Sequence, residues 1–151
     1  MKETIQWAME NKNERTELMI SFRPYSAVDR DKFEDLIEEA AQDKYLGDFV
    51  YTRKREDFVG FWSGKKLVGF AVPRKDSDGR YRTGAIFVTP DRRRDGIAAA
   101  FVKQYFENKK GRAYVNPENA ASVALYTSAG FHKSGKVIQD DQETLEEYLK
   151  G

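Results

Sequence analysis

The chain has 151 residues, with 26 lysines and arginines, 25 aspartates and glutamates, one histidine and no cysteine. This length fits one domain with a hydrophobic core. A net charge of +1 argues against a dedicated nucleic-acid-binding protein, which usually carries a clear basic excess. The absence of cysteine excludes disulfides and thiolate chemistry, and the single His132 excludes a multi-histidine metal site, so we expect no metal.

Membrane and export signals are also absent from the sequence. No apolar run approaches the roughly 20 residues needed to span a membrane. Residues 1–15 lack the apolar stretch of a secretory signal. We therefore expect a soluble cytoplasmic protein that does not bind membranes.

The N-terminal third predicts one strand and one helix. Residues 1–16 are polar and form either a short extra helix or an arm, an N-terminal extension to a domain expected over 17–151. Apolar residues alternate over 18–22, which is typical of a strand. Helical spacing of apolar residues predicts an amphipathic helix over 27–41, begun by Ser26 with Asp29. Residues 42–57 are mixed and predict irregular chain with room for a second short helix.

The rest of the chain predicts a meander followed by alternating helices and strands. Strands are expected over 58–62, 66–72 and 80–88, with turns at 63–65 and 75–79. A helix that begins at Ile97 and ends near Gly111, a strand over 113–115 and a helix over 119–129 follow. Residues 133–139 and 144–149 predict a hairpin, although 144–149 fits a helix equally well. We see no domain boundary, and this order predicts an α/β (α+β) domain, a mixed sheet covered by helices.

Residues 85–98 read AIFVTPDRRRDGIA and carry the most informative local pattern. An apolar run ends at Val88, a proline and three arginines follow, and Gly96 precedes an amphipathic helix. The N-terminus of a helix offers backbone N–H groups and partial positive charge to an anion. Glycine lets a ligand approach the backbone, and arginines bind phosphate oxygens. The pattern therefore indicates a phosphate-bearing ligand, and a solvated charged turn is the alternative. Neither the Walker motif nor the G-x-G-x-x-G motif is present.

A second motif, NAASVALYTSAGF, occupies residues 119–131. Together with V-x-P-x-x-R-x-x-G-x-A at 88–98, it resembles the GNAT superfamily of acyl-CoA-dependent N-acetyltransferases. The family signature [QR]-x-x-G-x-[GA] is matched at Arg93, Gly96 and Ala98. The second family motif is matched at Asn119, Ser122, Leu125, Tyr126, Gly130 and Phe131. The resemblance in the order of strands and helices covers about 17–150.

The resemblance implies a fold and a set of site residues. The fold is a mixed, mostly antiparallel central sheet flanked by helices, with a splay between the fourth and fifth strands. Phe87 and Val88 are expected to offer backbone groups to the pantetheine arm of acetyl-CoA, and Asn119 to bond the same region. The pyrophosphate is expected to be wrapped by Arg93, Arg94, Asp95, Gly96, Ile97 and Ala98. Tyr126 is expected to lie near the thioester sulfur and to act as general acid for the leaving thiolate.

These assignments are physically consistent, and each has a plainer alternative. Tyr126 lies seven residues after Asn119, about two helical turns, so both side chains share one face. A tyrosine is protonated at neutral pH, as a proton donor must be. Alternatively, Tyr126 is a core aromatic and Asn119 only a helix cap, a role compatible with binding. We interpret His132 as a surface residue.

The sequence departs from the family where a general base is expected. Many members carry a glutamate on the fourth strand, whereas residues 80–89 contain no carboxylate. The base is then a water chain or a carboxylate from elsewhere, with Asp48, Glu56 and Asp57 as weak candidates. The acidic stretch Glu38, Glu39, Asp43 and Asp48 either attracts a cationic amine or is a solvated helix face. Arg92 and Arg94 face either solvent or the 3′-phosphate of CoA.

The resulting hypothesis is an N-acetyltransferase that moves an acetyl group from acetyl-CoA to a primary amine by direct attack in a ternary complex. The acceptor is a small molecule or a protein amine, and the enzyme is a monomer or a homodimer. One alternative is a non-catalytic acyl-CoA-binding or regulatory module, motivated by the missing strand carboxylate. Another is acetylation of an aminoacyl-tRNA through the basic turn and residues 53–55, which the near-neutral charge disfavours.

Overall fold

The computed structural model describes residues 5–11, 16–140 and 143–151. The chain divides into two compact units, one made of Met1–Pro73 with Ala85–Ala98 and the other of Arg74–Gly84 with Ala99–Gly151. Each unit combines segments that are distant in sequence. The single domain expected over 17–151 stays a prediction.

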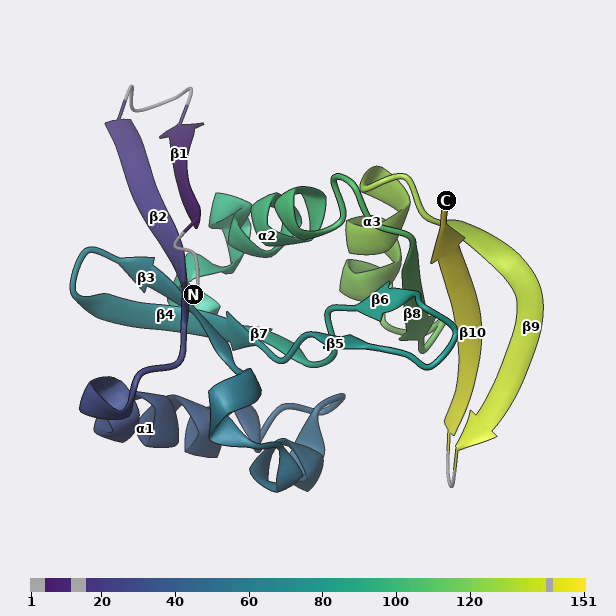
Figure 1. The fold of residues 1–151 in the computed structure, drawn as a ribbon, viewed down its shortest axis with the longest axis horizontal. Coiled ribbons are helices and arrows are strands. Elements are labelled where there is room, and N and C mark those ends of the chain that lie inside the picture. The colour runs from purple at the N-terminus through teal and green to yellow at the C-terminus, as the bar shows by residue number, and fades with distance from the viewer. Residues whose placement is uncertain (1–4, 12–15, 141–142) are drawn as a thin grey trace. The chain divides into compact units, whose positions relative to one another are not determined.

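The first unit is built on an antiparallel sheet with the strand order β1-β2-β3-β4-β7 (Figure 1). Its strands are Ile5–Asn11, Thr16–Pro24, Val59–Ser63, Lys66–Ala71 and Ile86–Val88. The predicted meander is confirmed, and Gly64 supplies the left-handed turn between β3 and β4 with a φ of 62°. The expected helix over 27–41 is present as the short 3₁₀ turn Ala27–Asp29 followed by α1, Arg30–Ala40.

The helix α1 buries one face against this sheet. Phe33, Leu36 and Ile37 recur at helical spacing and are each at most 6% exposed. They share one cluster with buried side chains from the strands and the segment before them, namely Phe58, Trp62, Leu67, Phe70 and Phe87. Edge-to-face ring contacts join Phe33 to Phe58 and to Trp62. The apolar stripe read from the sequence is therefore the core of this unit.

One of the two alternatives for the N-terminal residues was wrong. Residues 5–11 form the strand β1 and not a helix, pairing antiparallel with β2. The reason is visible in the sequence, because Ile5, Trp7 and Met9 alternate with more polar residues in the period of a strand. Ser26 precedes the helical segment at residue 27, as expected, although its side chain makes no capping hydrogen bond.

The second unit is built on a sheet with the order β5-β6-β8-β10-β9. Its strands are Arg74–Lys75, Tyr81–Arg82, Gly111–Val115, Glu143–Lys150 and His132–Asp140. All neighbours are antiparallel except β6 and β8, which pair in parallel at Tyr81 and Gly111. The predicted C-terminal hairpin is confirmed, so residues 144–149 form strand and not helix.

The helix α3, Ala120–Ser128, packs against β8 in this unit, and rings extend the packing. Phe131 makes edge-to-face contacts with Phe106 and Tyr126, at centroid distances of 4.9 and 5.2 Å. Gly111 lies directly under these rings, because a Cβ added there would stand 2.7 Å from Phe131 and 2.8 Å from Phe106. The glycine at the start of β8 is therefore a packing requirement.

The single strand expected over 80–88 is broken in two. β6 ends at Arg82, β7 begins at Ile86, and the two belong to different sheets. Gly84 has a φ of 64°, a conformation that interrupts a regular strand. The break places Thr83 at the end of β6 with its side chain buried. The expected splay between the strands on either side of α2 stays a prediction.

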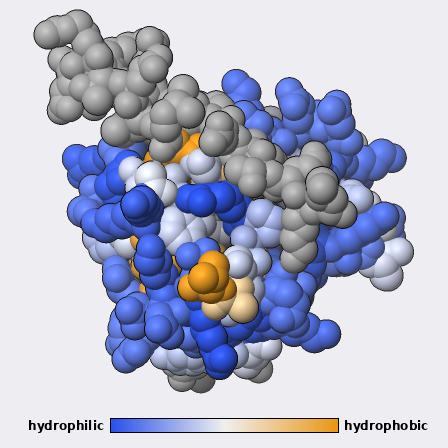
Figure 2. Space-filling view, turned by 60° about the vertical axis from the view of Figure 1, so that its left-hand side comes forward, coloured by the Kyte–Doolittle hydropathy of each residue, from blue (hydrophilic) through white to orange (hydrophobic). Residues whose placement is uncertain are grey.

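The surface agrees with the charged composition. Figure 2 shows a face on which most described side chains are hydrophilic, with only small hydrophobic areas between them. No helix within the described ranges is long and apolar enough to cross a membrane.

Candidate functional site

The basic turn contains more regular structure than the sequence indicated. Residues Pro90–Asp95 form the 3₁₀ helix η4, with the proline at its first position. Gly96 follows with a φ of 76°, and α2 begins at once and spans Ile97–Tyr105. The left-handed glycine turns the chain from one helix into the next. The first backbone N–H groups of α2 have no acceptor within the helix, which is a suitable arrangement for an anion.

The three arginines of η4 have different partners. Arg92 donates from Nε to the Asp95 carboxylate at 2.7 Å. Arg93 donates from Nε to the Val88 carbonyl at 2.8 Å and places its guanidinium over the Phe87 ring. Arg94 is exposed, and its side chain makes no hydrogen bond or ion pair with any residue that the structure describes. Arg94 is therefore the arginine most available to a ligand.

The edge strand β7 orients its backbone groups in two directions. The Thr89 N–H donates to the Val68 carbonyl of β4 at 2.9 Å. Backbone groups alternate in direction along a strand, so those of Phe87 also face β4, whereas those of Ile86 and Val88 face away. The Val88 carbonyl, which faces away from β4, accepts the hydrogen bond from Arg93, and a pantetheine contact of the Val88 N–H stays a prediction. Ile86, rather than Phe87, presents its backbone on the same side as Val88, and the Phe87 side chain is buried in the core.

Asn119 is the N-cap of α3. Its side-chain oxygen accepts a hydrogen bond from the Ser122 N–H at 3.2 Å, which satisfies one free donor of the first turn. The helix ends at Gly130, which has a φ of 94°, and the Phe131 N–H donates back to the Tyr126 carbonyl. Both helix ends expected from the sequence are confirmed. The capping role leaves the Asn119 amide NH₂ for another partner.

Tyr126 points its hydroxyl into the interior of the second unit. The residue is 7% exposed, and its oxygen lies 2.6 Å from Oγ1 of Thr83, which is 2% exposed. Burial raises the pKa of Tyr126, and the hydrogen bond with Thr83 opposes that rise. Sequence reasoning missed Thr83. The available signal was Gly84, an interior strand glycine that marks an irregular backbone beside it.

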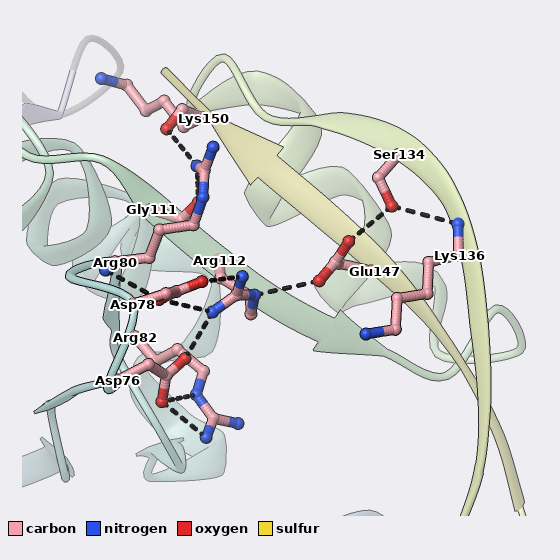
Figure 3. Close-up of polar contacts among 10 residues, drawn as sticks. All are labelled: Asp76, Asp78, Arg80, Arg82, Gly111, Arg112, Ser134, Lys136, Glu147 and Lys150. Carbon is pink, nitrogen blue, oxygen red and sulfur yellow. Dashed lines mark hydrogen bonds and ion pairs between the residues drawn. The ribbon is translucent and has the colours of Figure 1, made fainter.

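The second unit also contains a charged network centred on Arg112 (Figure 3). Arg112 donates to Glu147 at 3.0 Å, to Asp76 at 2.9 Å and to both oxygens of Asp78. Glu147 is 6% exposed and also accepts a hydrogen bond from Ser134 at 2.7 Å. The network joins the β5–β6 turn to β8, β10 and β9.

The carboxylates of this network titrate at low pH. Hydrogen bonds from Arg112 and the Arg80 N–H lower the pKa of Asp78 to about 2. Burial tends to raise the pKa of Glu147, but hydrogen bonds from Ser134 and Arg112 outweigh it and the pKa is lowered. Burial also tends to raise the pKa of Asp76, but hydrogen bonds from Arg112 and Arg82 lower it, so all three acids are ionised at neutral pH.

The other acidic residues considered from the sequence lie in the first unit. Glu56 and Asp57 belong to the 3₁₀ turn Arg55–Asp57 and are exposed, as ordinary surface carboxylates are. The side chain of Asp48 lies outside the described residues. Glu38 and Glu39 are exposed on α1, while Asp43 lies 3.7 Å from Arg93. Glu38 and Glu39 are thus solvated, and attraction of a cationic amine by this stretch stays a prediction.

Comparisons with known proteins assign the family. A model of the acetyltransferase (GNAT) domain matches residues 21–145. Among curated proteins, none matches the sequence. Solved structures do match, including an N-acetyltransferase from Staphylococcus aureus Mu50 with a TM-score of 0.68 and 14% identity, covering 85% of this chain and 99% of that one.

Two further structures extend the comparison. A GNAT-family acetyltransferase from Streptococcus agalactiae 2603 has a TM-score of 0.68 and 16% identity, over 87% of this chain and 94% of that one. A chain of the NatC complex bound to Gag peptide and CoA has a TM-score of 0.63 and 19% identity, over 86% and 96%. At these identities the structures show a shared fold. The family model covers most of the sequence, and the chain therefore belongs to the GNAT acetyltransferase family and is an acyltransferase.

Proposed function

We propose that the enzyme transfers an acetyl group from acetyl-CoA to a primary amine by direct attack in a ternary complex. The observation that carries this proposal is the buried Tyr126 hydroxyl at the family position of the general acid. A tyrosine is protonated at neutral pH, as a general acid must be, and the burial that raises the pKa of Tyr126 holds that proton more tightly until the sulfur leaves. The Thr83 hydroxyl is its neighbour.

The residues present fit the proposed co-substrate. Acetyl-CoA would supply the activated acetyl thioester. Its phosphates need cationic and N–H donors, and the first turn of α2 after Gly96 offers the N–H groups. Arg94 offers a guanidinium that no described side chain occupies. Arg93 would act mainly on the shape of the turn, since it is bound to the Val88 carbonyl.

The proposed chemistry needs one bond made and one broken. The amine nitrogen attacks the thioester carbonyl carbon, the carbon–sulfur bond breaks, and the sulfur takes the Tyr126 proton. The residues 80–89 provide no carboxylate, so we propose that the amine loses its proton to water. A covalent acetyl-enzyme is not required, and the chain has no cysteine to carry one.

Titration calorimetry with acetyl-CoA and a thiol-release assay over several classes of amine test the proposal. We expect saturable acetyl-CoA binding, amine-dependent thiol release and intersecting lines in two-substrate kinetics. Parallel lines would indicate a covalent intermediate and contradict direct attack. No binding of acetyl-CoA by the folded protein would refute the proposal as a whole.

A further inference from the structure

The hydroxyl of Thr83 is the single close polar neighbour recorded for the Tyr126 oxygen among the described residues. The oxygen–oxygen distance of 2.6 Å lies at the short end of the range for hydroxyl hydrogen bonds. Both residues belong to the second unit, and both are nearly inaccessible to solvent. Thr83 is therefore the group that responds directly when the phenol loses its proton.

The Thr83 proton has little competition. Its other acceptor is the Gly84 carbonyl at 3.4 Å, which is long for a hydroxyl donor. A hydroxyl can donate one hydrogen bond and accept others. Thr83 can thus donate to the phenol oxygen, which leaves the phenol proton for a leaving group, and it can keep this bond once the phenol is ionised. No backbone movement is needed for this.

The backbone before Thr83 is fixed by the interactions shown in Figure 3. Arg80 donates to the carbonyls of Gly111 and Lys150 at 3.1 and 3.3 Å. Asp76 binds both Arg82 and Arg112. These contacts connect the β5–β6 segment to β8 and β10, so the backbone that carries Thr83 is held in place. A hydroxyl presented from such a segment can hold a phenol in one orientation.

We propose that Thr83 is a positioning residue for Tyr126: its Oγ1 fixes the direction of the phenol and donates a hydrogen bond to the phenol oxygen when the proton leaves. This inference rests on the proposed function, in which Tyr126 protonates the departing sulfur. The atoms balance, because the phenolic proton goes to sulfur and the Thr83 hydrogen stays on its own oxygen. Water then returns a proton to Tyr126.

The physical need for such a partner follows from burial. Burial raises the pKa of Tyr126 and so disfavours loss of its proton. A hydrogen bond to the ionised oxygen favours that state and reduces the penalty. Thr83 therefore makes a deeply buried phenol usable as an acid.

The test compares Thr83→Val, which keeps the shape, with Thr83→Ser, which keeps the hydroxyl, both in the full-length protein. We expect Thr83→Val to lower kcat about tenfold, while KM for acetyl-CoA changes less than about twofold. The loss is smaller than the roughly 10²–10⁴-fold that a general acid contributes, because Tyr126 itself is still present. Thr83→Ser should restore most of kcat. Thr127→Val, at an exposed threonine next to Tyr126, is the matched control and should match the wild type. Thermal melts check folding, and Thr83→Ala replaces Thr83→Val if the latter fails to fold.

A double-mutant cycle separates positioning from a structural role. In a Tyr126→Phe background, Thr83→Val should have almost no further effect on kcat. An equal loss in both backgrounds, or a serine variant as poor as the valine variant, would overturn the proposal.

A readout without turnover separates this inference from the proposed function. The protein labelled with ¹³Cζ-tyrosine, with Tyr126 assigned by Tyr126→Phe, gives the tyrosine pKa by NMR. Thr83→Val should shift the Tyr126 titration to higher pH. An unchanged titration contradicts the role of Thr83 whatever the activity. A shifted titration in a protein that acetylates no amine supports the Thr83 hydrogen bond and refutes the proposed function.

Discussion

Glu147→Gln tests whether the Arg112 network stabilises the second unit. The Glu147 side chain is 8% exposed, and that of Arg112 is 14% exposed. Glutamine keeps the size of the side chain but has one acceptor oxygen in place of two. Either Ser134 or Arg112 must then lose its hydrogen bond, and the guanidinium loses one of its three carboxylate partners. We expect a folded but less stable protein.

The expected size of the loss follows from the contacts. A hydrogen bond to a charged group contributes about 1.5–3 kcal/mol, and Arg112 keeps two other acids, so we expect a loss of about 2 kcal/mol in the free energy of unfolding. In a chain of this length about 1 kcal/mol corresponds to roughly 2–4 °C, so Tm should fall by about 4–8 °C.

The effect should depend on pH. The pKa of Glu147 is lower in the folded protein than its ordinary value of 4.5, so folding favours the ionised form. The stabilisation is fully present above the ordinary value and is lost as pH falls through the lowered folded value. The difference between wild type and Glu147→Gln should therefore be largest near neutral pH and shrink in acid.

Urea unfolding at several pH values measures both effects. Glu146→Gln is the control, because the neighbouring Glu146 lies 3.6 Å from an exposed Lys133 and should change stability by at most about 0.5 kcal/mol. Equal midpoints for the two variants at neutral pH would refute the reasoning. A difference that persists unchanged in acid would show that the charge of Glu147 is not its source.

Three further predictions concern ligand binding and packing. Arg94→Ala should raise Kd for CoA about tenfold in calorimetry, with Lys103→Ala as a charge-matched control, since one charge-assisted phosphate contact is worth at least about 1.5 kcal/mol. If the loss disappears with dephospho-CoA, Arg94 serves the 3′-phosphate. Gly111→Ala should destabilise the protein by about 1–3 kcal/mol in urea unfolding, because its Cβ would meet the rings above it, and an unchanged midpoint would contradict this. Asn119→Ala should lose about 1 kcal/mol with the cap, whereas Asn119→Asp should keep the cap and stability. Weaker CoA binding by the aspartate variant would support a ligand contact, and unchanged binding would leave Asn119 with capping alone.

Local structure could be predicted where neighbouring residues decide it. The turn at Gly64, the cap at Asn119 and the end of α3 at Gly130 each depend on a glycine or a short polar side chain at a defined position. The break at Gly84 was missed because the run of apolar and β-branched residues over 80–88 outweighed a single glycine. Pattern alone also did not show that the two halves of this run join different sheets, since strand partners lie far away in sequence.

In the candidate site, too, local motifs could be predicted and contacts between distant residues could not. Its motifs, from Arg93 to Ala98 and from Asn119 to Phe131, are contiguous and could be found in the sequence. The Thr83–Tyr126 hydrogen bond joins residues 43 positions apart, and the Arg112 network joins residues 34 to 36 positions apart. No local pattern predicts such pairs, because they depend on the folded backbone.

Phosphate binding at Arg94 and proton transfer at the Thr83–Tyr126 pair should respond differently to salt, so kinetics can distinguish them. Arg94 is exposed, so its attraction for phosphate is screened by salt, with a screening length of about 10 Å at 0.1 M. The Thr83–Tyr126 pair is buried and neutral, so salt acts on it weakly. Raising ionic strength should therefore increase KM for acetyl-CoA while kcat stays nearly constant, and Arg94→Ala should flatten that dependence. Thr83→Val should lower kcat without changing the salt dependence of KM. If salt instead lowered kcat and left KM unchanged, the assignment of phosphate binding to the exposed turn and of proton transfer to the buried pair would be wrong.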